Sequence, residues 1–146
     1  MRRVTEKDKS IFVELTKEFY NSPAVIQPIP ESTILRTFHE IIRSNEYIEG
    51  FIIENENQDV GYGIISKSFS PEAGGPVIWF EEVYVRDGYQ GKGLGREFFG
   101  FIEEAYKEQV KRLRLEVEVD NERAVDLYKR LGYDFLKYNQ MVKDFE

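Results

Sequence analysis

The stretch VYVRDGYQGKGLGREFF, residues 83–99, places three glycines at alternate positions between an apolar run and an amphipathic helical pattern. A phosphate-binding P-loop is excluded, because Lys92 is followed by Gly93 and not by the Ser or Thr that would bind magnesium. A dinucleotide-binding turn is a weak match, since Gly91, Gly93 and Gly95 read GxGxG and lie late in the chain. A plain turn rarely needs three glycines, because each one costs backbone entropy on folding. The pattern therefore favours a ligand-binding loop.

The ligand predicted for this loop is a diphosphate. Glycines leave successive backbone N–H groups unobstructed by Cβ atoms, and a helix that begins near Leu94 would add the positive end of its dipole. Lys92 and Arg96 either add positive charge at the rim or are solvated surface residues. The prediction therefore depends mainly on the backbone.

The segments on either side of the loop read as strands and a helix. The run VIWFEEVYV, residues 77–85, is apolar on both faces apart from its two glutamates, as expected of a central strand. A helical stripe follows at residues 98–106, and then RLRLEVEVD, residues 112–120, alternates as a half-buried strand. That strand would place Glu116 and Glu118 on the polar face, beside the glutamates of the central strand.

The remaining elements follow from the same patterns. We expect helices at 10–19 and 31–43, separated by a proline-containing loop, and then two strands joined by a turn at about residues 54–59. A short helix is predicted from an Asp120 or Asn121 N-cap to Gly132, before a last β segment at 133–145.

Composition limits the kinds of protein this can be. A chain of 146 residues with 41% hydrophobic and 32% charged residues fits one soluble domain spanning 1–146, and its apolar runs are too short for a membrane span, so we expect a cytoplasmic protein. The absence of cysteine excludes a thiol nucleophile, and a single histidine argues against a metal site. A net charge of −7 opposes binding to nucleic acid or anionic membrane and favours a cationic small molecule or peptide amine, although solubility alone also explains it.

Two motifs resemble those of the GNAT superfamily of acetyl-CoA-dependent N-acetyltransferases. Val83-Tyr84-Val85 followed by Gln90-Gly91-Lys92-Gly93-Leu94-Gly95 matches that family's apolar-x-apolar strand end and its (Q/R)xxGx(G/A) loop. Asn121 followed seven residues later by Tyr128 matches the second family signature. The resemblance covers nearly the whole chain, most strongly residues 77–135.

The resemblance implies an α/β (α+β) fold. Its sheet would be mixed and mostly antiparallel, with six to seven strands, helices on both faces, and a cofactor cleft where strands 4 and 5 splay apart. Acetyl-CoA would be the cosubstrate, with no metal; its pantetheine would pair with the backbone of Val83 and Val85, and the Val83 amide would polarise the thioester carbonyl. The cofactor-binding residues implied are Val83, Tyr84, Val85, Gln90, Gly91, Lys92, Gly93, Leu94, Gly95, Arg96 and Asn121.

Glu81 and Glu82 are the candidates for the base that deprotonates an amine acceptor. An alkylamine with a pKa of about 10.4 is neutral in only roughly a few molecules per ten thousand at pH 7, so acyl transfer needs its proton removed. The strand at residues 77–85 is similar to that of spermidine/spermine and related small-amine acetyltransferases. This resemblance implies that Glu81 is the residue with the proton-transfer role. A β-bulge would change which side chain faces the cleft, and Glu82 has an alternative role as an ion-pair partner of Arg112 or Arg114.

Tyr128 would protonate the departing CoA thiolate, as the resemblance implies. Without Asn121 seven residues earlier, a tyrosine on an apolar helical stripe would be read as a core residue. Asn121 itself is expected to cap the helix while touching the cofactor.

These observations predict acetyl transfer to a primary amine by direct attack, with a small cationic amine as the acceptor. Acetylation of a protein amine and a non-catalytic CoA-binding sensor are the alternatives, and the sensor would have no use for Glu81 and Tyr128. A homodimer is suggested by the family resemblance only, and the residues themselves do not indicate an oligomeric state.

Overall fold

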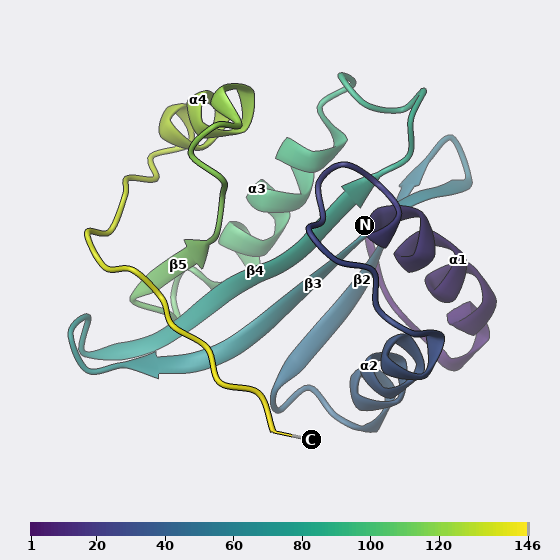
Figure 1. Cartoon of the computed structure of the whole chain (residues 1–146), viewed down its shortest axis with the longest axis horizontal. Helices are drawn as coiled ribbons and strands as arrows, with labels where there is room; N and C mark the ends of the chain where they lie inside the picture. The colour runs from purple at the N-terminus through teal and green to yellow at the C-terminus, as the bar shows by residue number, and fades with distance from the viewer. Residues whose placement is uncertain (146) are drawn as a thin grey trace. The chain divides into compact units, whose positions relative to one another are not determined.

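The computed structural model describes residues 1–145, which divide into two compact units with their boundary in the sequence between Leu115 and Glu116. The first unit holds a five-stranded sheet with three α-helices, and the second holds one short helix (Figure 1). No helix within residues 1–145 is long and apolar enough to cross a bilayer.

The sheet has the strand order β1-β2-β3-β4-β5, and its first four strands are antiparallel. Only β4 and β5 are parallel, which confirms the mixed, mostly antiparallel sheet. The β2–β3 hairpin turns at Glu56 and Asn57, both in the left-handed region with φ of 50° and 64°, which suits the twist of a tight hairpin. The strands are β1 (Arg2–Arg3), β2 (Ile48–Asn55), β3 (Gln58–Ser70), β4 (Gly75–Val85) and β5 (Arg112–Leu115).

The predicted count of six to seven strands is wrong, because the described chain has five. β5 ends at Leu115 instead of continuing to residue 120, and residues 133–145 contain no strand. Alternation of apolar and polar residues shows only which side chains share a face, whereas a strand also needs a neighbour that satisfies its N–H and C=O groups. Glu116 and Glu118 therefore lie outside the sheet.

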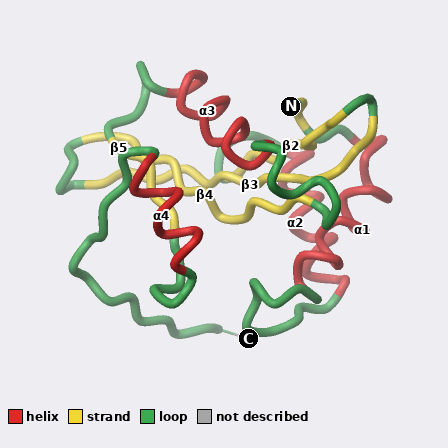
Figure 2. The backbone as a smooth tube through the Cα atoms, turned by 90° about the horizontal axis from the view of Figure 1, so that it is seen from above, coloured by secondary structure: helices red, strands yellow, loops and turns green. Residues whose placement is uncertain are grey.

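Three α-helices cover the sheet: α1 (Lys9–Tyr20), α2 (Glu31–Arg43) and α3 (Leu94–Tyr106). These bounds agree with the predicted helices to within one or two residues, because each helix has a regular apolar stripe. In Figure 2 the sheet lies between α3 and the pair α1 and α2.

The alternation of side chains along β3 explains why both faces are covered. Tyr62 packs with Phe12 of α1 and with Ile52 in the core beneath α1 and α2. Gly63, the next residue, faces α3, where an added Cβ would lie 2.3 Å from the Cζ of Phe98. Helices on both faces of the sheet are thus confirmed.

The second unit contains α4 (Glu122–Arg130), whose ends agree with the sequence analysis. The Asn121 side chain accepts a hydrogen bond from the Ala124 N–H at 3.2 Å and caps the first turn. Beyond the last turn, Gly132 has a φ of 94°, and its N–H donates to the Lys129 carbonyl.

Candidate active site

The glycine loop joins β4 to α3, and its glycines have two different explanations. Gly91 and Gly93 have φ of 78° and 82°, so the backbone itself requires a residue that tolerates the left-handed region. Gly95 lies inside α3 with no positive φ, and an added Cβ there would meet no atom within 4 Å. Neither the backbone conformation of Gly95 nor its packing against the described residues requires a glycine there.

The N-terminus of α3 is open to an anion. Gly93 is its N-cap and supplies no side chain to accept from the first-turn N–H groups. Lys92 and Arg96 are exposed at this end, and neither forms an ion pair within residues 1–145, although Lys92 Nζ lies 5.1 Å from the centre of the Tyr89 ring. Free amides, a helix dipole and two unpaired cations fit a diphosphate.

β4 extends beyond its parallel neighbour. The β4–β5 pairing runs from Val77 with Arg112 to Phe80 with Leu115 and stops there, while β4 continues to Val85. In the described chain, no strand pairs with this edge of β4 after Phe80, so its backbone groups, apart from the Val85 carbonyl that accepts from Gln90, are available to an extended ligand.

A cavity of about 890 Å³ lies beside this end of β4. It is bordered by the end of α1, by the start of the loop that follows α1, and by the last residues of β4 with the turn after it. Within that turn, Gln90 donates from Nε2 to the Val85 carbonyl at 2.8 Å. The lining residues are Glu18, Phe19, Asn21, Ser22, Pro23, Ala24, Val83, Tyr84, Val85, Arg86, Asp87 and Gln90.

A β-bulge interrupts β4 at the two glutamates. Ile64 of β3 pairs with Glu82 and Ile65 pairs with Phe80, so Glu81 is the extra residue without a partner. The register of the strand therefore changes at Glu81, as the sequence analysis allowed.

The bulge turns both carboxylates to the same face of the sheet. The Tyr62 hydroxyl donates to Glu82 Oε2 at 2.7 Å, and the Ser66 hydroxyl donates to Glu81 Oε1 at 2.5 Å. Tyr62 and Ser66 are four residues apart in β3 and share the face covered by α1 and α2. From α1 itself, the Tyr20 hydroxyl donates to the other oxygen of Glu82.

The two glutamates have different environments. Glu82 is partly buried, and this burial raises its pKa; the hydrogen bonds from Tyr20 and Tyr62 oppose the rise, and the nearby charge of Glu81 adds to it. Glu81 is exposed. This contrast arises because only Glu82 points under α1.

Neither glutamate forms an ion pair with a basic residue of the described chain. Arg112, one of the two partners considered for Glu82, lies 3.3 Å from Glu72. Arg114, the other, stacks on Trp79 with its guanidinium carbon 4.0 Å from the ring centre. Neither carboxylate is therefore neutralised by a cation of the described chain.

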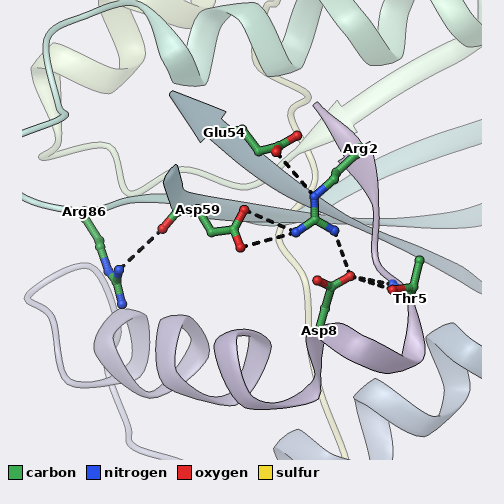
Figure 3. A network of polar contacts seen from close by, with 6 residues as sticks. All are labelled: Arg2, Thr5, Asp8, Glu54, Asp59 and Arg86. Atoms are coloured by element: carbon green, nitrogen blue, oxygen red, sulfur yellow. Dashed lines mark hydrogen bonds and ion pairs between the residues drawn. The ribbon is translucent and has the colours of Figure 1, made fainter. Parts of the chain in front are cut away.

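Arg86 is a residue that the sequence analysis did not single out. Its Nη1 donates to the Asp59 carbonyl at 3.4 Å, and the Asp59 carboxylate lies 3.2 Å from Arg2, which also binds Asp8 at 2.8 Å (Figure 3). Tyr20 and Tyr62 were missed as well. The sequence offered one signal for both residues, a tyrosine within an apolar pattern. A hydroxyl buried at such a position needs a hydrogen-bond partner.

The second unit holds the other two predicted site residues. Tyr128 lies on α4, where burial raises its pKa, and its ring centre is 6.2 Å from that of Tyr133. Asn121 uses its side-chain oxygen for the helix cap. A tyrosine with a raised pKa stays protonated at neutral pH and retains a proton to donate.

Comparison with known proteins shows which family the chain belongs to. A model described as the acetyltransferase (GNAT) family matches residues 10–133. The chain is 40% identical over 74 residues to a thialysine N-epsilon-acetyltransferase of Bos taurus, covering 50% of this chain and 43% of that protein. It is 34% identical over 62 residues to a spermine/spermidine N(1)-acetyltransferase of Bacillus subtilis (strain 168), covering 40% of each. Each match thus spans less than half of the relative's length.

The fold also has solved counterparts. One is AAC(6')-Iy in complex with the bisubstrate analogue CoA-S-monomethyl-acetylneamine, with a TM-score of 0.80, 13% identity, and coverage of 99% of this chain and 96% of that one. At this level of identity, the likeness concerns the fold alone.

Proposed function

Because the chain belongs to the acetyltransferase (GNAT) family, we propose that it transfers an acetyl group from acetyl-CoA to a primary amine of a small cationic molecule. The names of two relatives support this acceptor class, since one is a thialysine and the other a spermine/spermidine acetyltransferase. The CoA-containing analogue bound to a protein of the same fold supports the cosubstrate.

One observation carries the proposal. The bulge in β4 sets two carboxylates on one face of the sheet, without a basic partner in the described residues, immediately before the unpaired strand edge at Val83–Val85. A pair of carboxylates with no basic partner attracts a cationic amine, and one with a raised pKa is a suitable proton acceptor near neutral pH. The cavity beside Val83 provides space for a small molecule.

The glycine loop and the edge of β4 would hold the cosubstrate. Acetyl-CoA supplies an acetyl group activated as a thioester. The amides from Gly91 to Arg96 bind its diphosphate, and Lys92 and Arg96 add charge at the rim. The backbone of Val83 and Val85 pairs with the pantetheine, and the Val83 N–H polarises the thioester carbonyl.

Glu82 and Tyr128 carry out the two proton transfers of the reaction. Glu82 takes a proton from the ammonium group, whose nitrogen then attacks the acetyl carbon; a C–N bond forms as the C–S bond breaks. Glu81, which is exposed, attracts the cation to the site. Tyr128 gives its proton to the thiolate, and the second proton that the acetylated nitrogen loses returns through solvent to Tyr128, so the products are an amide and free thiol with the ammonium proton on Glu82.

The test is release of free thiol from acetyl-CoA with a panel of diamines, amino acids and peptides. Wild type is compared with Glu81→Gln, Glu82→Gln and Tyr128→Phe, and calorimetry measures CoA binding by each. We expect turnover with small diamines and a loss of about 100-fold in kcat for Glu82→Gln and Tyr128→Phe with unchanged CoA affinity. Acceptance of peptides alone would instead indicate a protein acetyltransferase. Tight CoA binding with equal, negligible turnover in all variants would indicate a sensor.

A further inference from the structure

Tyr20 connects the proposed proton acceptor to the loop that borders the cavity. It is the last residue of α1, and its hydroxyl donates to Glu82 Oε1 across 62 positions of sequence. The next four residues, 21–24, all line the cavity. The Tyr20 side chain thus lies between the wall of the cavity and the partly buried carboxylate of Glu82.

The two hydrogen bonds to Glu82 come from parts of the fold that differ in mobility. Tyr62 belongs to the middle of β3, is fully buried, and packs edge-on against Phe12 with ring centres 5.7 Å apart. Tyr20 lies at a helix end, is only partly buried, and is followed by Asn21 as the C-cap. Helix ends and the loops after them open at lower free energy than central strands. A shift of the loop would therefore break the Tyr20 bond first.

We propose that Tyr20 is a positioning residue, which fixes one carboxylate oxygen of Glu82 from the end of α1 and makes its release depend on the position of the loop that follows. The inference rests on the proposed role of Glu82. Tyr62 keeps the carboxylate attached to the sheet, while movement of the loop at residues 21–24 withdraws Tyr20 and frees Oε1 for the proton of the amine. Binding of the acceptor in the cavity and readiness of the base are then coupled.

The pKa of Glu82 can be measured to test whether the Tyr20 hydroxyl acts on its carboxylate. The groups that face it are Tyr20 from α1, Tyr62 from β3 and Glu81 from β4. A phenol that donates to a carboxylate favours the ionised form, so removal of the Tyr20 hydroxyl raises the pKa of Glu82 further. Loss of one hydrogen bond to a charged carboxylate corresponds to a change of about one unit in its pKa.

The experiment is a carboxyl ¹³C NMR titration of the ligand-free protein, with the Glu82 signal assigned by its loss in Glu82→Gln. Tyr20→Phe is compared with Tyr47→Phe, which removes a hydroxyl from a tyrosine that is 60% exposed. We expect the midpoint of Glu82 to rise by about one unit in Tyr20→Phe only, and the acidic limb of the kcat profile to move with it. A Glu82 midpoint equal in the two variants would overturn the inference. Since the titration needs no turnover, an inactive wild type would refute the proposed function without deciding this point.

Hydrogen exchange tests whether the bond between Tyr20 and Glu82 in turn holds the loop at residues 21–24. Glu82→Gln weakens the acceptor of the Tyr20 bond, whereas Glu81→Gln leaves that bond in place. The amides of Asn21, Ser22 and Ala24 should exchange several-fold faster in Glu82→Gln than in Glu81→Gln. Equal rates in the two variants would show that the bond does not hold the loop.

Discussion

Glu18 and Arg86 lie 2.8 Å apart, measured from Oε1 to Nη2, and join the last turns of α1 to the first residue after β4. The same Glu18 carboxylate accepts a hydrogen bond from the Tyr84 hydroxyl at 3.2 Å, and Glu14 lies 2.6 Å from Arg86. The Arg86 guanidinium lowers the pKa of Glu18, with Tyr84 acting in the same direction. Since Glu18 and Arg86 both line the cavity, this contact sets the distance between two of its walls.

Replacement of Arg86 should destabilise the protein through this contact. Arg86→Met retains most of the aliphatic stem but leaves Glu18 without its cation, so we expect the free energy of unfolding to fall by about 1–2 kcal/mol in urea titrations. Lys17→Met is the control, because its pair with Glu31 is half exposed and should contribute less than about 0.5 kcal/mol. Equal losses in the two variants would contradict a special role for Arg86.

Alanine substitutions should separate the two kinds of glycine in the loop. Gly93→Ala forces a side chain into the left-handed region and should cost about 1–2 kcal/mol of stability. Gly95→Ala places a better helix former in an open position and should raise stability by about 0.5 kcal/mol. Isothermal calorimetry should nevertheless show weaker CoA binding by both variants. Unchanged affinity in Gly95→Ala would mean that the missing side chain serves no ligand.

The stability of the protein should depend on the ionisation of Glu82. Its pKa is raised in the folded state, so its contribution to stability is fully present below the ordinary pKa of a glutamate and is lost as pH rises through the folded value. The stability of Glu82→Gln relative to wild type should therefore increase between pH 4 and pH 8. Urea unfolding at several pH values measures this difference, and a decrease with pH would show that the hydrogen bonds from Tyr20 and Tyr62 outweigh burial.

The buried carboxylate of Glu49 should contribute to stability and not to CoA binding. It is 3% exposed, lies 2.6 Å from Arg3 and 2.9 Å from Lys67, and accepts from the Tyr106 hydroxyl. Glu49→Gln removes the charge from these contacts and should lower the free energy of unfolding by about 2 kcal/mol, with CoA binding unchanged. Glu54→Gln, whose carboxylate is 38% exposed and 3.5 Å from Arg2, should change it by less than about 0.5 kcal/mol. Similar thermal melts for the two variants would argue against a structural role for Glu49.

Most elements of the fold could be predicted because their signals are local. The apolar stripes of α1, α2 and α3 need only neighbouring residues, and the Asn121 cap and the Gly132 terminator lie at the ends of the helix that they define. The strand predictions that failed lie at residues 116–120 and 133–145. A strand requires a partner, and the pattern of one segment carries no information about its neighbours.

The sequence by itself determined the glycine loop, the strand before it, and the presence of two adjacent glutamates at the end of that strand, since chain connectivity and side-chain size set these features. Only the tertiary structure decided that a bulge turns both carboxylates to one face and that Glu82, not Glu81, lies partly buried between Tyr20 and Tyr62. The register of β4 depends on its pairing with β3, and burial depends on a helix more than 60 residues away in sequence. Contacts of that range appear only once the chain has folded.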